Sequence, residues 1–207
     1  MTAKDAPANS SRTDPSRAAR LHAATHSTHE ALDISIMAAR PFDSIQAYAR
    51  FLRLQHAFHR EAAPLYAGPA LAGPFADLAG SGRLDAVLRD AAALGIELPL
   101  HAEAPPAAAG LALLESLGWL YVVEGSNLGA AFLLKAAGRL GLTQDRGAAH
   151  LAEPPEGRAN RWRAFKRALD AVELSRSGEL RAVAGANAAF ARMRVLVPRF
   201  LIPGFPG

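Results

Sequence analysis

One stretch of the chain is strongly apolar yet carries glycines where a helix would be expected to be regular. Residues 119–134 read WLYVVEGSNLGAAFLL, and their flanks are apolar at helical spacing. Gly125 and Gly129 lie one turn apart on one face of this predicted helix, and each costs roughly 1 kcal/mol relative to alanine. Such a pair indicates that a flat or bulky group approaches the backbone, that the helix bends, or that another helix packs closely there.

The composition predicts an all-α protein. Half of the 207 residues are hydrophobic, alanine and leucine are abundant, and β-branched residues are few. The length suits one domain, which we expect over residues 17–200, between a disordered N-terminal tail at 1–16 and a short tail at 201–207. The chain has no cysteine, so it has no disulfide or thiolate metal site, which fits a cytoplasmic protein.

Hydrophobic periodicity and capping residues place the expected helices. We expect Asp14 to cap the first helix and Asp43 to cap the second. The pattern predicts helices at about residues 14–39, 44–66, 69–79, 82–94, 110–141, 158–174 and 178–196.

The charge and hydropathy of the chain restrict the classes of partner that it is expected to bind. The net charge is +4 with a pI near 9.9, and the densest basic cluster falls in residues 158–167. This cluster indicates either a solvated helix face or a site for anions, and no nucleic-acid recognition motif accompanies it. The most apolar segment, residues 111–123, contains Glu115 and is followed by Glu124, so we expect no membrane span and no membrane partner.

Three histidines, His22, His26 and His29, lie on the first predicted helix. His29 shares a face with apolar residues and has Asp33 one turn later, so we expect Asp33 to accept a hydrogen bond from Nδ1 and orient Nε2 outward. A histidine in such a place is either a satisfied core residue or a ligand. A carboxylate-bridged metal site is disfavoured because no Glu-x-x-His pair is present.

The two helices suggest a common explanation. One offers an axial imidazole at His29, and the other offers a backbone exposed by Gly125 and Gly129. A flat, iron-bearing macrocycle held between them would account for both features. Its propionates would need cations, which the basic helix could supply.

The motifs also resemble those of a known family. Residues 21–33, LHAATHSTHEALD, resemble the proximal-helix motif of haem (heme) oxygenases, and residues 121–129, YVVEGSNLG, resemble the distal-helix motif of the bacterial branch. Residues 48–64 also resemble that branch, and order and spacing agree over about residues 17–196. The resemblance implies a haem-oxygenase-like helical bundle that sandwiches haem between a proximal and a distal helix. It further implies that O₂ and electrons split haem into biliverdin, CO and Fe²⁺.

The resemblance also assigns roles to individual residues. It implies that His29 is the proximal ligand of the iron and that Gly125 and Gly129 let the distal helix lie over the haem. The backbone at Gly125 would approach bound O₂. Tyr121, one turn earlier, would reach a propionate, and Arg163 falls where the family carries a basic propionate partner.

Two positions depart from the family pattern. Ser126, followed by Asn127, stands where the mammalian-type enzymes carry an aspartate that organises water, so the resemblance leaves open which group orders the distal water. His22 stands where the family usually has lysine or arginine, and a partly charged histidine would hold a propionate less firmly.

Other functions remain alternatives at this point. The same fold could serve a non-catalytic haem-binding or carrier protein. It could also serve a non-haem enzyme of the same superfamily, although the chain lacks the cysteine of the thiamin-degrading type and the Glu-x-x-His pair of the di-iron type. An oxygenase would need an external electron donor, and the basic surface suits an acidic reductase or ferredoxin-type partner. Monomer and dimer are both left open.

Overall fold

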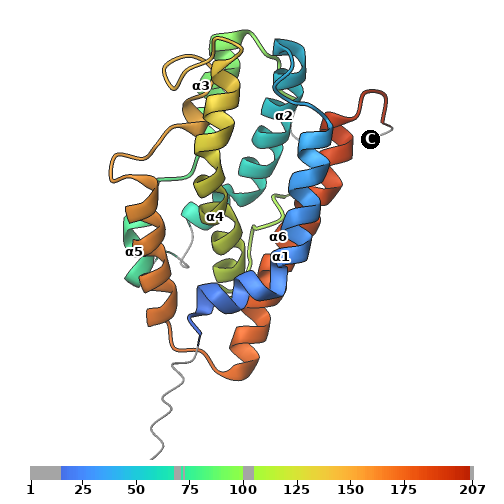
Figure 1. Cartoon of the computed structure of the whole chain (residues 1–207). Coiled ribbons are helices and arrows are strands. Elements are labelled where there is room, and N and C mark those ends of the chain that lie inside the picture. The colour runs from blue at the N-terminus through green and yellow to red at the C-terminus, as the bar shows by residue number, and fades with distance from the viewer. Residues whose placement is uncertain (1–14, 68–70, 72, 100–104, 206–207) are drawn as a thin grey trace, which may run out of the picture.

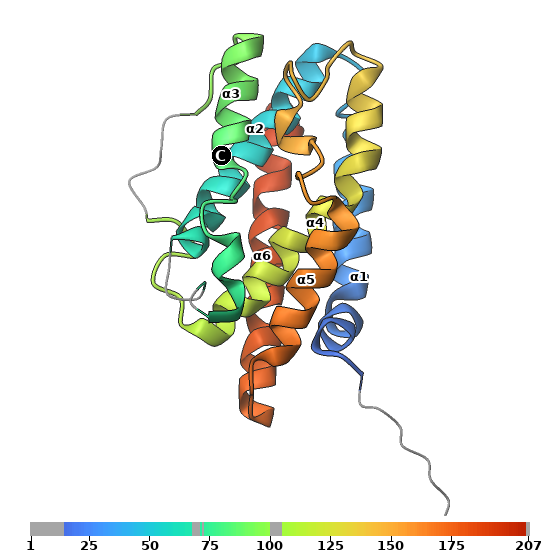
Figure 2. The ribbon, with the colours of Figure 1, turned by 90° about the vertical axis from the view of Figure 1, so that its left-hand side faces the viewer.

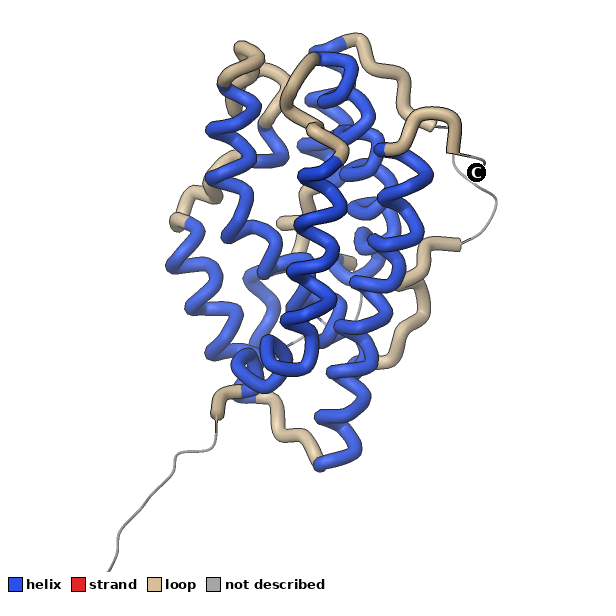
Figure 3. Tube along the Cα trace, turned by 45° about the vertical axis from the view of Figure 1, so that its right-hand side comes forward, coloured by secondary structure: helices blue, strands red, loops and turns tan. Residues whose placement is uncertain are grey.

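The protein is a bundle of helices. The computed structural model describes residues 15–67, 71, 73–99 and 105–205, and this part of the chain contains no β-strand (Figure 3). The predicted all-α class is therefore confirmed. The elements are α1 (Arg17–Ala38), α2 (Ile45–Ala62), η1 (Ala63–Tyr66), η3 (Gly73–Leu78), α3 (Leu84–Leu94), α4 (Leu113–Gly138), η4 (Ala149–Leu151), α5 (Arg158–Ala171) and α6 (Arg176–Leu201).

Serine hydroxyls cap three of the helices. The Oγ atoms of Ser16, Ser44 and Ser175 accept the backbone N–H of the residue three positions later, at 3.1–3.2 Å. Ser44 rather than Asp43 therefore caps α2, because its hydroxyl accepts the free N–H of Ala47 in the first turn. The other expected cap, Asp14, and residues 1–14 of the tail expected at 1–16 lie outside the described residues. Helix α6 continues to buried Leu201, beyond the helix end predicted at about residue 196.

The first residue of α1 is already part of the folded domain. The backbone N–H of Arg17 donates to Asp170 Oδ1 at 2.7 Å, and its guanidinium donates to Glu179 at 2.9 Å and to the Val172 carbonyl at 2.7 Å. These bonds satisfy carbonyls at the end of α5 and tie α1 to both α5 and α6.

Helices α4 and α6 form the centre of the bundle, and their closest approach depends on two glycines. Helix α1 runs beside α6, and α5 packs on α4 from the other side (Figure 1). Helices α2 and α3 lie together against this core (Figure 2). A Cβ atom on Gly118 or Gly185 would overlap the main chain of the facing helix. The small-residue packing considered for Gly125 and Gly129 therefore occurs at Gly118 instead, about two turns earlier.

Helix α4 is more apolar than expected from residues 111–123 alone. It extends to Gly138, and by length and composition it is the one helix in the described residues that could cross a membrane. Half of its most apolar window is buried inside the protein. We attribute its hydropathy to its central place in the bundle, where α5, α6 and η4 pack around it.

Candidate functional site

A cavity of about 740 Å³ lies between α1 and α4. Residues of α2, α5 and α6 complete its wall, and this volume is in the range of cofactor sites. Eight of the nine residues predicted for the site line it: His22, His29 and Asp33 from α1, and Tyr121, Gly125, Ser126, Asn127 and Gly129 from α4. The two predicted helices therefore face each other across one cavity.

His29 lies on the α1 side of this cavity. Its ring centroid is 5.6 Å from that of buried Phe190 on α6, and about half of its side chain is exposed. Nε2, rather than the expected Nδ1, lies 3.4 Å from Asp33 Oδ2. This i, i+4 contact joins two exposed side chains, so it constrains the imidazole only weakly and leaves it available to a ligand.

The two glycines of α4 leave space on the opposite side. A Cβ atom on Gly129 would have no neighbour within 4 Å among the described residues, and one on Gly125 would make an ordinary 3.6 Å contact with Trp162. No packing of the described protein atoms thus explains why glycine occupies either position. Both line the cavity, where side chains would fill space that a flat ligand needs.

Ser126 and Asn127 have partners close by. The Ser126 hydroxyl donates to the Val123 carbonyl at 2.7 Å, and Asn127 Nδ2 donates to Glu124 Oε2 at 3.3 Å. Each side chain therefore uses a hydrogen-bond donor within its own helix. The Ser126 oxygen can still accept a hydrogen bond from a group in the cavity.

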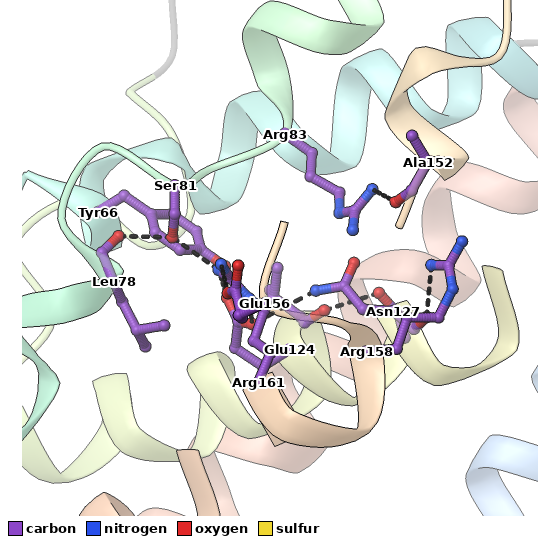
Figure 4. A network of polar contacts seen from close by, with 12 residues as sticks. Tyr66, Leu78, Ser81, Arg83, Glu124, Asn127, Ala152, Glu156, Arg158 and Arg161 are labelled. Atoms are coloured by element: carbon purple, nitrogen blue, oxygen red, sulfur yellow. Dashed lines mark hydrogen bonds and ion pairs between the residues drawn. The ribbon is translucent and has the colours of Figure 1, made fainter. Parts of the chain in front are cut away.

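A buried network holds the segment of α4 just before Gly125 (Figure 4). The Glu124 carboxylate accepts hydrogen bonds from Tyr66 Oη at 2.7 Å and from Arg161 Nε at 2.8 Å. Burial, followed by the Glu124 charge, raises the pKa of Tyr66 well above its usual value, so the phenol stays a donor. Arg161 also donates to Ser81 Oγ at 2.6 Å, which links α5 to the turn before α3. The distal backbone is thus fixed before any ligand binds.

The basic helix α5 supplies a different cation from the one expected. Arg163 is exposed, donates to Asn160 Oδ1 at 3.1 Å, and is absent from the described residues that line the cavity. Lys166 lines it instead, together with Trp162 one turn earlier on the same face. Arg158 and Arg161 serve the fold, because their guanidinium groups bind carbonyls and Glu124. Of these two cations, Lys166 rather than Arg163 therefore lies in the wall of the cavity.

Tyr121 also lines this cavity. Its ring centroid is 5.7 Å from that of Trp162, and burial raises the pKa of its hydroxyl. The phenol therefore stays protonated and can donate a hydrogen bond to an anionic group that enters the cavity.

The inner wall contains polar residues that the sequence did not single out for this site. Gln55, His59, Arg83 and His150 all line the cavity, and both histidines are buried. Burial, followed by the charges of His150 and Arg83, lowers the pKa of His59 to about 3, so its ring is neutral. Gln55 and His59 share one side of α2, and that spacing was the available signal. Arg83 comes from the N-cap of α3 and His150 from the short η4, and no periodicity places either residue.

Three carboxylates of α2 and α4 have arginine partners. Glu61 pairs with Arg192, Glu115 with Arg181, and Glu124 with Arg161. Among residues 15–67, 71, 73–99 and 105–205, no cluster of three or more His, Cys, Asp or Glu side chains could hold a metal ion.

Comparison with known proteins agrees with this geometry. A family model described as heme oxygenase matches residues 16–199, and the chain belongs to the heme oxygenase family. Heme oxygenase PigA of Pseudomonas aeruginosa is 43% identical over 183 residues, which cover 88% of this chain and 92% of that protein. The solved structure of NO- and CO-bound heme oxygenase from Neisseria meningitidis has a TM-score of 0.85 and 38% identity, covering 93% of this chain and 95% of that chain. These relatives support an oxygenase over the carrier and non-haem alternatives.

Proposed function

We propose that this protein binds haem between α1 and α4 and cleaves it oxidatively to biliverdin, CO and Fe²⁺. The observation that carries the proposal is the pairing of His29 with Gly125 and Gly129 across one cavity, with open space at Gly129. When bound, haem supplies an iron that activates O₂ and is itself the substrate that is cleaved. His29 would ligate the iron from the α1 side. Because Asp33 is exposed and 3.4 Å away, it would polarise the His29 ring only weakly.

The other residues bind and orient the substrate. Lys166 and the Tyr121 hydroxyl line the cavity and could hold propionates, and His22 and His26 add imidazole rings on the α1 side, with centroids 5.0 Å apart. Gly125 presents its backbone to the distal space, and Ser126 and Asn127 lie next to it. The Glu124–Arg161 pair keeps that backbone in place.

The reaction needs electrons from outside the protein. The net charge of +4 and the arginines of α5 favour an acidic ferredoxin-type or reductase partner, because opposite charges accelerate encounter. Such reduced carriers are available in the cytoplasm, and we place the reaction there.

A titration with hemin followed by reductant under air tests this function. We expect a Soret band that gives way to biliverdin-like absorption. A stable Soret band under these conditions would point to a carrier, and the absence of any Soret shift would exclude a haem site.

A pair of variants tests the axial ligand. His29→Ala is expected to remove the imidazole-ligated spectrum and turnover while the free protein remains helical, because the side chain is half exposed. His26→Ala is the matched control, since it lies on the same helix, lines the same cavity and is 53% exposed. It is expected to keep the imidazole-ligated spectrum. Full turnover by His29→Ala would show that His29 is not the ligand.

A further inference from the structure

Asn127 follows Gly125 by two residues in the wall of the cavity, and one end of its side chain is free. The residue is 7% exposed, and it lines the cavity. Its Nδ2 atom lies 3.3 Å from Glu124 Oε2. No described residue donates a hydrogen bond to its Oδ1 atom, and Oδ1 is not among the fully buried side-chain atoms that lack a partner. The amide oxygen is therefore open to a donor that is not part of the described chain.

The chemistry of Glu124 fixes which way this amide faces. The Glu124 carboxylate accepts Tyr66 Oη at 2.7 Å and the Arg161 guanidinium at 2.8 and 3.1 Å. A carboxylate paired with arginine is an acceptor only, so the NH₂ group of Asn127 must face it, and the reverse orientation would bring two oxygens together. Figure 4 shows the amide nitrogen of Asn127 turned toward Glu124. Because the two ends of the planar amide diverge, Oδ1 points away from Glu124.

Asn127 is also held through its main chain. Its backbone carbonyl accepts Arg158 Nη1 from α5 at 3.1 Å. The side chain is thus fixed by Glu124 at one end and the backbone by α5 at the other. Ser126 differs, because its hydroxyl contacts only its own helix, at the Val123 carbonyl. Of the two polar residues after Gly125, Asn127 therefore has the orientation that the surrounding protein determines more closely.

We propose that Asn127 orders the distal water of the cavity, with Oδ1 accepting a hydrogen bond from a water molecule near Gly125. Glu124, Tyr66 and Arg161 are positioning residues that act through the Asn127 amide. The proposal rests on the proposed haem oxygenase function and assigns the water-ordering group that the sequence left open.

An oriented amide oxygen suits this task. Cleavage of haem by O₂ consumes protons, and water in the cavity can deliver them. A water molecule that donates one hydrogen to Oδ1 has its second hydrogen fixed in direction, which reduces the cost of orienting it during the reaction. An amide oxygen does not titrate near neutral pH, so it accepts at any working pH. Asparagine also avoids a second carboxylate 3.3 Å from Glu124, where two negative charges would repel each other.

Hydrogen exchange of the Asn127 side-chain amide, measured by NMR on the protein without haem, tests the orientation. We expect one Nδ2 proton to exchange slowly in the wild type, because Glu124 holds it. Glu124→Gln keeps the shape of the side chain and removes its charge, and it is expected to accelerate this exchange at least tenfold. Rapid exchange of both Nδ2 protons in the wild type would overturn the proposal, whether or not the variant folds.

Haem turnover tests the role of the amide oxygen. Asn127→Leu has a similar volume and no acceptor, and it is expected to lower kcat roughly tenfold to a hundredfold while the affinity for hemin stays within about twofold. The solvent deuterium isotope effect on kcat should rise in this variant, because proton delivery becomes slower, and a purely structural change would not raise it. Thermal unfolding checks that the variant is folded.

Ser126→Ala tests the competing assignment. It removes the neighbouring hydroxyl, and its loss of kcat is expected to be smaller than that of Asn127→Leu. An equal or larger loss in Ser126→Ala, or an unchanged isotope effect in Asn127→Leu, would overturn the role of Asn127. If the wild type did not degrade haem, the proposed function would fail, while the exchange measurement would still decide the orientation of the amide.

Discussion

Gly185 of α6 packs directly on the main chain of Glu115 in α4. A Cβ atom at position 185 would lie 2.8 Å from the carbonyl carbon of Glu115 and closer still to its oxygen. Gly118 makes the reciprocal approach to the main chain of α6 near Ala182. The two glycines thus set the distance between the central helices, and through it the position of the distal part of α4.

Gly185→Ala is therefore expected to destabilise the fold. Separating two packed helices costs about 1–3 kcal/mol, which outweighs the roughly 1 kcal/mol that alanine contributes to helix propensity. Urea unfolding followed by circular dichroism measures the change. Gly138→Ala, in the facing helix α4 and with no neighbour within 4 Å among the described atoms, is the control and should not be destabilised. Equal stability of the two variants would contradict the close approach.

Substitution at Gly129 should separate folding from binding. Gly129→Leu meets no described atom at its Cβ, so the free protein should unfold at a temperature no lower than that of the wild type. The added side chain occupies space in the cavity, and haem binding should weaken roughly tenfold to a hundredfold. Thermal unfolding and hemin titration measure the two effects. Unchanged haem affinity would place the macrocycle elsewhere.

The sequence predicted the helices and the two facing motifs because both are local patterns. Apolar spacing of 3.6 residues placed α1, α2, α4 and α6, and glycines at a four-residue interval marked the bare face of α4. It did not separate the glycines that face the cavity from Gly118, which faces α6. That difference depends on which helix packs on which face. Arg83 and His150 were missed for a related reason. They come from the N-cap of α3 and from the short η4, which are distant in the sequence, and no hydrophobic periodicity places such short segments next to each other.

Substitutions in the basic helix α5 test which of its cations contributes to haem binding. Lys166→Met should weaken haem binding by up to about fivefold, the upper end expected for an exposed ion pair, and high salt should reduce the difference. Arg163→Met removes the same charge from the same helix but faces away from the cavity, so it should bind haem as the wild type does. Hemin titrations at low and high ionic strength measure this. A loss confined to Arg163→Met would restore the original assignment.

The buried histidines should make the free protein less stable in weak acid. The pKa of His59 is about 3 in the folded protein and near 6.5 when the chain unfolds, so the unfolded state binds the extra proton between these values. Stability is therefore fully present above pH 6.5 and declines toward pH 3, by about 1.4 kcal/mol per pH unit for each proton taken up on unfolding. Urea unfolding between pH 6.5 and 5, where carboxylates remain ionised, measures the slope. His59→Gln should reduce the slope of unfolding free energy against pH by the part that is due to the His59 proton. The lowered pKa of His150 should leave some pH dependence of stability in that variant. A wild-type slope identical to that of His59→Gln would show that His59 can accept a proton without leaving the folded state.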